Sequence, residues 1–132
     1  MATLNIPAPK RASADSAEVP VPPSTNNLFR GTGNRRFRTR EYKDWAEVAE
    51  LILATLRPPT AFPCAIVVRV RGKLNVQRDL DNLLKPIGDA LVASGALPAD
   101  DVRRVAKWEV SYEAGPGEAV AVVELRPIES QT

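Results

Sequence analysis

The residues best suited to chemistry are aspartates that lie between positions 79 and 101. Asp79 and Asp81 stand two residues apart, and an adjacent pair, Asp100 and Asp101, follows further along the chain. Magnesium prefers hard oxygen ligands and usually keeps several waters, so two or three carboxylates suffice to bind it. A spacing of two places both side chains on one face of an extended chain. The spacing therefore predicts a divalent-metal site formed by Asp79 and Asp81, with a third carboxylate from Asp100 or Asp101.

A lysine follows the first two aspartates on a predicted helix. Asp81, Lys85 and Asp89 fall at positions i, i+4 and i+8 of that helix and so share one face. Lys85 would then contact a phosphate oxygen or stabilise developing negative charge beside the metal. The structural alternative is an aspartate that caps the helix, a surface ladder through Lys85, and an ordinary turn at residues 100–101. From the residues alone both interpretations stay open.

Basic residues are concentrated where a polyanion would need them. Residues 30–43 hold six basic side chains and one acidic side chain, a local charge of about +5, whereas the whole chain carries +2. A second basic group, Arg69, Arg71, Lys73 and Arg78, leads directly into the acidic motif. Such groups neutralise phosphates, although a solvated loop is the alternative. The candidate polyanion-binding residues are Arg30, Arg35, Arg36, Arg38, Arg40, Lys73 and Arg78.

The residue inventory excludes several kinds of chemistry. The chain has no histidine, which removes Ser-His-Asp and Cys-His mechanisms and any zinc site that needs imidazole. Its one cysteine, Cys64, cannot form an intrachain disulfide, and the surrounding apolar run predicts a core residue. No apolar segment approaches the roughly 20 residues that span a bilayer, and no secretory signal is recognisable. We therefore expect a cytoplasmic protein.

One domain must position these side chains. The chain has 132 residues, of which 44% are apolar and 26% charged, an ordinary balance for a globular domain. Residues 1–16 are rich in Ala, Ser and Pro and predict a flexible N-terminal tail. We place the domain at residues 17–128 and a short C-terminal tail at residues 129–132.

The periodicity of apolar residues predicts a mixed α/β arrangement. A helix is expected over residues 39–56, with Thr39 as its N-cap and its aromatic stripe in the core. A second helix starts at the acidic motif, is irregular near Pro86, and stops at Gly95. Strands are predicted at residues 17–21, 65–71, 106–112 and 119–125, the last two pairing as a terminal hairpin.

The acidic motif resembles that of the RusA family of Holliday-junction resolvases, small endodeoxyribonucleases of bacteria, prophages and phages. The matching string is Asp79-Leu80-Asp81-Asn82-Leu83-Leu84-Lys85, followed by Asp89-Ala90-Leu91, then Gly95 and Asp100-Asp101. Upstream, Pro22-Pro23-Ser24-Thr25-Asn26 is similar to the N-terminal Pro-Pro-Ser-x-Asn element of the family. The resemblance covers about residues 17–126.

This resemblance implies a small mixed β-sheet with two main helices, an α/β (α+β) fold that works as a homodimer. It implies cleavage of four-way DNA junctions in recombination and repair, with Mg²⁺ as cofactor and Mn²⁺ as a substitute. The metal ligands would be Asp79, Asp81 and Asp101, with Asp100 as the alternative to Asp101, and the catalytic lysine would be Lys85. A twofold dimer would supply two active sites to a twofold-related substrate.

The partners implied are branched DNA and a second copy of the chain, with no membrane and no organic cofactor. The expected location is the cytoplasm of a bacterial or phage-infected cell, and the basic residues would contact the DNA backbone. Two alternatives stand beside this hypothesis: a catalytically silent DNA- or RNA-binding protein, and a nuclease that acts on forks or flaps.

Overall fold

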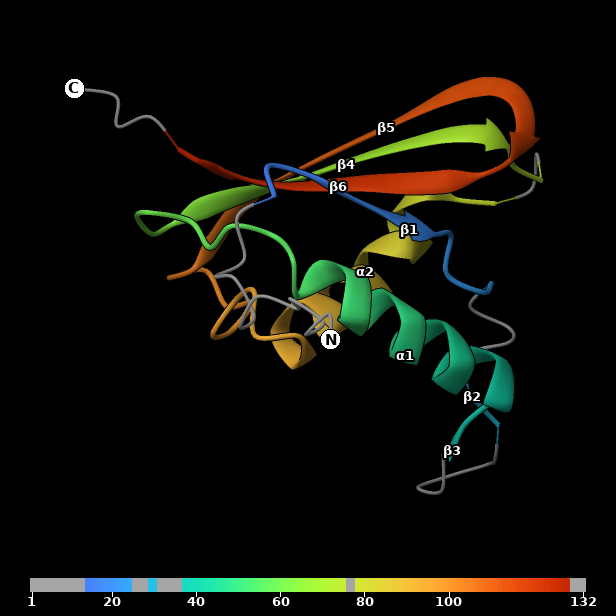
Figure 1. Cartoon of the computed structure of the whole chain (residues 1–132), viewed down its shortest axis with the longest axis horizontal. Coiled ribbons are helices and arrows are strands. Elements are labelled where there is room, and N and C mark those ends of the chain that lie inside the picture. The colour runs from blue at the N-terminus through green and yellow to red at the C-terminus, as the bar shows by residue number, and fades with distance from the viewer. Residues whose placement is uncertain (1–13, 25–28, 31–36, 76–77, 129–132) are drawn as a thin grey trace, which may run out of the picture.

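The computed structural model describes residues 14–24, 29–30, 37–75 and 78–128, and both predicted tails lie wholly or mostly outside these ranges. A four-stranded sheet forms one layer, and the two α-helices pack together against one of its faces (Figure 1). The expected small mixed sheet with two helices is therefore confirmed. The elements are β1 (Ala17–Pro20), β2 (Phe29–Arg30), β3 (Phe37–Arg38), α1 (Arg40–Leu53), β4 (Cys64–Lys73), the 3₁₀ helix η2 (Leu80–Leu83), α2 (Leu84–Ala93), β5 (Val105–Glu118) and β6 (Val120–Pro127).

The order of strands in the sheet is β1-β6-β4-β5. β4 runs parallel to β5 and antiparallel to β6, and it lies between them. The predicted terminal hairpin of the last two strands is therefore wrong. Ile66 and Val68 of β4 face the helices and the core, while Ala65 and Val67 are buried on the opposite face. A strand that is apolar on both faces is best placed at the centre of a sheet, and β4 takes that place.

Helix α1 forms as its sequence predicts, although it ends at Leu53. The Oγ1 of Thr39 accepts a hydrogen bond from the backbone N–H of Tyr42 at 3.1 Å, which confirms the predicted N-cap. Tyr42 and Trp45 are buried, so the aromatic stripe belongs to the core. The indole Nε1 of Trp45 donates to the carbonyl oxygen of Pro20 at 2.7 Å and joins α1 to the end of β1.

Helix α2 lies in the connection between the parallel strands β4 and β5, where a crossover is required. Its entry is irregular, as predicted, because the 3₁₀ helix η2 precedes it directly. Pro86 fits in the first turn of α2, where backbone N–H groups have no partner within the helix. Gly95 follows the helix with φ of +86°, the left-handed conformation expected of a glycine at this position. In the described part of the chain, no helix is long and apolar enough to cross a membrane.

Ala14 and Asp15 contact the domain, although they precede its predicted start at residue 17. The N–H of Ala14 donates to the carbonyl oxygen of Thr55 at 2.9 Å, and the N–H of Arg57 donates to that of Ala14 at 2.8 Å. Asp15 forms an ion pair with Arg57 at 2.8 Å. Cys64 is buried as predicted, and burial raises the pKa of its thiol.

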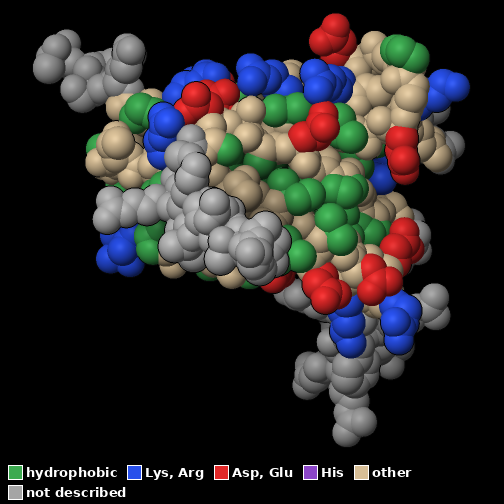
Figure 2. Space-filling view, in the orientation of Figure 1, with side chains coloured by type: hydrophobic (Ala, Val, Ile, Leu, Met, Phe, Trp, Pro, Cys, Tyr) green, Lys and Arg blue, Asp and Glu red, His purple; other side chains and the backbone are tan. Residues whose placement is uncertain are grey.

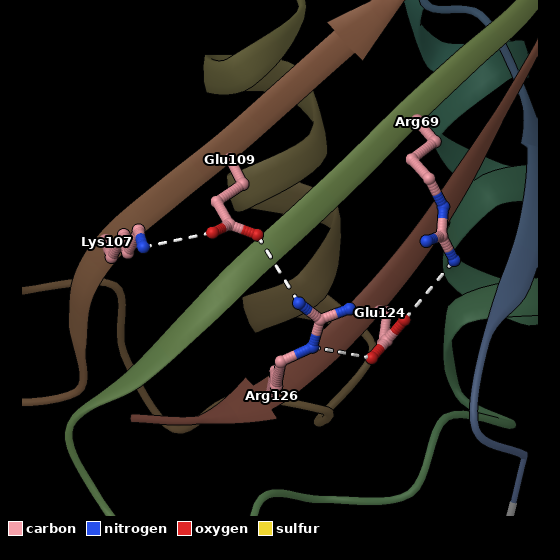
Figure 3. A network of polar contacts seen from close by, with 5 residues as sticks. All are labelled: Arg69, Lys107, Glu109, Glu124 and Arg126. Atoms are coloured by element: carbon pink, nitrogen blue, oxygen red, sulfur yellow. Dashed lines mark hydrogen bonds and ion pairs between the residues drawn. The ribbon is translucent and has the colours of Figure 1, made fainter. Parts of the chain in front are cut away.

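The face of the sheet opposite the helices carries a network of ion pairs (Figure 3). Arg126 contacts Glu124 at 3.0 Å and Glu109 at 3.4 Å, Lys107 contacts Glu109 at 3.0 Å, and Arg69 contacts Glu124 at 3.4 Å. In the space-filling view, acidic and basic side chains are interspersed along the upper side of the molecule, where the sheet lies (Figure 2). Each such exposed pair contributes at most about 1 kcal/mol to stability. The charges of this network are largely paired, so the face attracts phosphate less than its basic residues suggest.

Candidate functional site

The acidic motif lies where the chain enters the crossover to β5. Asp79 is extended, with φ of −92° and ψ of 133°, and η2 starts at the next residue. Arg78 and Leu80 are half-buried on either side of it, and Leu80 packs against the core. Successive side chains of an extended chain point to opposite sides, so Asp79 points outward and is exposed. Asp81 is exposed in the first turn of η2.

Asp79 stands at the N-cap position of η2, which is the role that the structural alternative assigns to it. Among the described residues, however, its carboxylate accepts no capping hydrogen bond from the helix. A polar side chain at this position normally accepts such a bond. The carboxylate of Asp79 is therefore available to another partner.

Lys85 and Asp89 lie on one face of α2, as the spacing predicts. The Nζ of Lys85 contacts the Oδ1 of Asp89 at 3.1 Å. Lys85 is 78% exposed and Asp89 is 31% exposed, so solvent screens the pair. Asp89 raises the pKa of Lys85 through this hydrogen bond and its charge, and Asp100 adds a smaller effect in the same direction. Lys85 therefore stays a cation at neutral pH.

Asp100 lies against α2. A Cβ placed on Gly88 would stand 3.6 Å from the Oδ2 of Asp100 and 3.4 Å from the Cζ2 of Trp108. Gly88 lies one turn after Lys85, and the charge of Asp100 acts on Lys85. The structure thus brings one residue of the second acidic pair to the helix that the first two aspartates precede.

Asp101 has different partners. Its Oδ1 accepts a hydrogen bond from the backbone N–H of Arg103 at 3.0 Å, and its Oδ2 lies 3.1 Å from the Nη2 of that arginine. The Nη1 of Arg104 lies 3.7 Å from the same Oδ2. Arg103 lowers the pKa of Asp101 below its usual range. This arrangement matches the ordinary turn of the structural alternative, and Asp101 would have to leave these arginines to bind a cation.

The donor chemistry of the motif fits a hard divalent cation. Asp79 and Asp81 are both exposed carboxylates at one helix entrance, and Mg²⁺ often uses only one or two carboxylates. Within the described residues, no group of three potential ligand side chains is already assembled for a metal ion. The expected third carboxylate therefore does not stand together with the first two in this structure.

The basic candidates fall into three groups. Arg40 is exposed at the first residue of α1, and Lys73 is exposed at the end of β4. The guanidinium of Arg78 instead donates to the carbonyl oxygen of Pro22 at 2.8 Å. The side chains of four candidates lie outside the described residues: Arg30, Arg35, Arg36 and Arg38.

Two structural features of these basic segments were not predicted. The backbone of β2 pairs with that of β3 as a short antiparallel ribbon just before α1. Arg69 and Arg71 project from the uncovered face of the sheet, where Arg71 pairs with Glu18 at 2.9 Å. The acidic partners of both arginines come from distant segments, so no local pattern announces them.

A cleft of about 660 Å³ opens beside the motif. It lies between residues 20–24, helix α1 and the connection that follows β4. Its lining combines Glu41 and Asp44 with Lys73 and Arg78, over an apolar base that includes Trp45. Because acidic side chains line the cleft together with basic ones, its charge does not favour the binding of phosphate along its whole length.

Tyr112 was missed by sequence reasoning. Its hydroxyl donates to the carbonyl oxygen of Gly72 at 2.7 Å and accepts from the backbone N–H of Leu74 at 3.3 Å. These two groups lie at the end of β4, where the chain leaves the sheet towards Asp79. In the sequence Tyr112 appears only as one of several alternating apolar residues of a strand.

Comparison with known families agrees with the motif and the fold. The profile of the family described as endodeoxyribonuclease RusA matches residues 19–125, which include both helices and the acidic motif. No curated protein matches the chain significantly. The family match covers well over half of the 132 residues. The chain therefore belongs to the RusA family of endodeoxyribonucleases, enzymes that resolve Holliday junctions.

Proposed function

We propose that this endodeoxyribonuclease requires Mg²⁺, accepts Mn²⁺ in its place, and works as a homodimer that cuts four-way junctions by two symmetric nicks. The observation that carries the proposal is the carboxylate of Asp79, which caps no helix among the described residues and is exposed next to Asp81 at the entrance of the crossover helix. An exposed pair of hard oxygen donors suits a hydrated Mg²⁺. The cytoplasm of a bacterial or phage-infected cell is the compartment where such an enzyme meets branched DNA.

Asp79, Asp81 and Asp101 would hold the cation, with Asp100 as the alternative to Asp101. A bound divalent cation would polarise the scissile phosphate and lower the pKa of a coordinated water. Asp100 lies against α2, and Asp101 would have to exchange its contacts with Arg103 for the cation. Asp79 and Asp81 are common to both ligand sets.

Lys85 would place a positive charge beside the scissile phosphate. An ordinary lysine is already protonated at neutral pH and Asp89 raises the pKa of Lys85 further, so Lys85 would act as a cation and not as a general base. A fixed cation stabilises negative charge that develops on phosphate oxygens in the transition state. The exposed ammonium of Lys85 is free to turn from Asp89 towards a substrate, because the pair is largely solvated.

The remaining basic candidates would contact the DNA backbone without reading its sequence. Arg40 and Lys73 are exposed and stand at the ends of α1 and β4. Arg30 and Arg38 belong to the β2–β3 ribbon that directly precedes α1. The homodimer supplies a second active site, because a junction resolved by two symmetric nicks needs two sites related by a twofold axis.

The proposal is tested by incubating labelled four-way, forked and linear duplex DNA with the protein in Mg²⁺, in Mn²⁺ and in EDTA. We expect paired symmetric nicks in the four-way junction with either metal, and intact DNA in EDTA. Cutting of forks or flaps at the same rate as four-way junctions would favour the alternative hypothesis of a nuclease that acts on forks or flaps. Binding without nicking at every metal concentration would replace it by the silent DNA-binding protein.

A further inference from the structure

The turn between α2 and β5 holds three charged side chains in one cluster. The Oδ2 of Asp101 lies 3.1 Å from the Nη2 of Arg103 and 3.7 Å from the Nη1 of Arg104, so two guanidinium groups converge on one oxygen. Neither arginine belongs to the basic segments that the sequence singles out. We propose that Arg103 and Arg104 form a DNA-phosphate site that the carboxylate of Asp101 fills until DNA binds, so that the phosphate releases Asp101 to the divalent cation. The proposal rests on the function proposed above, and it couples the metal site to the substrate.

The backbone of this turn is held at both ends. The N–H groups of Arg104 and Val105 donate to the carbonyl oxygen of Asp101 at 2.9 and 2.8 Å. The carbonyl oxygen of Arg104 accepts from the N–H of Cys64, the buried first residue of β4, at 2.7 Å. The sheet therefore holds the backbone in place, and the exchange of partners needs only rotations of the side chains.

The turn adjoins the helix that carries Lys85. Asp100, directly before the turn, approaches α2 at Gly88, where a Cβ would stand 3.6 Å from its Oδ2. Gly88 lies three residues after Lys85, which is about one helical turn. A phosphate bound at the turn would therefore lie near the helix that presents the proposed catalytic lysine.

The exposure of the two arginines suits an external anion. The side chain of Arg103 is 77% exposed and that of Arg104 is 32% exposed, and in the described part of the chain both form their ion pairs with Asp101. Val102, in the middle of the turn, is 82% exposed, so the tip of the turn is open to solvent. A guanidinium pairs with a phosphate as well as with a carboxylate, because both anions offer two oxygens to its planar fork.

Phosphate binding and metal binding favour each other here because both break the same ion pairs. A cation that takes Asp101 leaves the arginines without their anion, and a phosphate that takes the arginines leaves Asp101 without its partners. When both ligands bind, the pairs are broken once instead of twice. One exposed ion pair shifts an equilibrium by up to about 5-fold, so we expect a coupling of this size through Arg103.

The experiment compares Arg103→Gln, Arg103→Lys and the control Arg126→Gln with the wild type. Arg103→Gln removes the charge, whereas Arg103→Lys keeps it. Arg126 is a close match for Arg103, because it is also exposed and pairs with an acidic residue two positions away, Glu124, at 3.0 Å. It lies on the face of the sheet opposite the helices. Since Arg103 is exposed, its replacement should alter the unfolding midpoint little, which urea unfolding checks.

The first assay measures Mn²⁺ binding by electron paramagnetic resonance in the absence of DNA. Arg103→Gln should bind Mn²⁺ about 3- to 5-fold more tightly than the wild type, because Asp101 no longer leaves this guanidinium to reach the cation. The same substitution in an Asp101→Asn background should leave the Mn²⁺ affinity unchanged, because its effect acts through that carboxylate. An equal gain in both backgrounds would overturn the proposal and attribute the effect to repulsion between Arg103 and the cation.

The second assay measures the salt dependence of four-way junction binding in EDTA by fluorescence anisotropy. Each lost phosphate contact reduces the slope by about 0.9. Arg103→Gln should reduce the slope by at least this amount, while Arg103→Lys and Arg126→Gln should keep the wild-type slope. A wild-type slope in Arg103→Gln would overturn the phosphate site.

The third assay compares junction affinity in EDTA and in Ca²⁺, a hard cation that takes oxygen ligands, under conditions in which gel analysis shows intact DNA. Ca²⁺ should raise the affinity of the wild type about 3- to 5-fold more than that of Arg103→Gln. An equal effect of Ca²⁺ on the two proteins would overturn the coupling, even if Arg103 contacts phosphate.

Failure of the proposed function would give a different pattern. A wild type that binds no Mn²⁺ and cuts no junction would refute the metal site proposed above, and the coupling with it. The salt slope of Arg103→Gln would still decide whether the turn binds phosphate, because that assay contains no free divalent cation.

Discussion

Asp81→Asn is expected to lower the rate of junction cleavage by more than about 100-fold. Loss of a group that only orients a metal ligand costs up to about 100-fold, and Asp81 is proposed to bind the metal directly. Asparagine has almost the same shape as aspartate but no negative charge, so the site loses a hard anionic ligand. Junction binding in EDTA should be unchanged, because no metal is present in this assay for Asp81 to bind. Asp81 is exposed, and its replacement should alter the free energy of unfolding by less than about 0.5 kcal/mol.

The measurement is single-turnover cleavage of a labelled four-way junction in Mg²⁺, together with urea unfolding of each variant. Asp15→Asn is the matched control, because Asp15 is an exposed aspartate whose partner is Arg57, far from the motif in sequence. Cleavage by Asp81→Asn at the rate of Asp15→Asn would refute the assignment of Asp81 as a metal ligand.

Lys85→Met should lower the cleavage rate at saturating DNA by about 100- to 1000-fold, the range observed when one group that stabilises transition-state charge is removed. The Michaelis constant should change much less, because the charge acts chiefly on the transition state. Lys85→Arg keeps the positive charge and should retain more activity than Lys85→Met. The control is Lys107→Met, a lysine of the opposite face that pairs with Glu109.

The pH profile separates a cationic role of Lys85 from a basic one. Asp89 raises the pKa of Lys85, so the ammonium is stable and would lose its proton only above the usual pKa of lysine. The ratio of the wild-type rate to the Lys85→Met rate should therefore stay constant from about pH 6 to pH 9. A ratio that grows with pH over this range would indicate a general base, and equal rates of Lys85→Met and Lys107→Met would remove Lys85 from the mechanism.

Elements set by neighbouring residues could be predicted from the sequence. Thr39 caps α1 through a bond to a residue three positions away, and Gly95 ends α2 through its own backbone conformation. The pairing of strands could not be predicted in the same way. The apolar alternation in β5 and β6 shows that each is a strand, but it carries no information about the partner, and β4 lies between them.

The same distinction between local and long-range interactions applies to the candidate site. The spacing of Asp79, Asp81 and Lys85 is local, so the motif could be located from the order of the residues alone. The partner of Arg78 lies 56 residues away in the sequence and that of Tyr112 lies 40 residues away. In the sequence, an arginine before an acidic motif is equally consistent with a phosphate contact and with a structural hydrogen bond. Only the fold shows that Arg78 donates to Pro22.

The central claim is that Asp79 and Asp81 hold the divalent cation of this endodeoxyribonuclease. The most direct test is Mn²⁺ binding, measured by electron paramagnetic resonance, to the wild type and to the double variant Asp79→Asn with Asp81→Asn. The account predicts binding by the wild type and its loss in the double variant, with the unfolding midpoint preserved. Equal Mn²⁺ affinity in the two proteins would contradict the account.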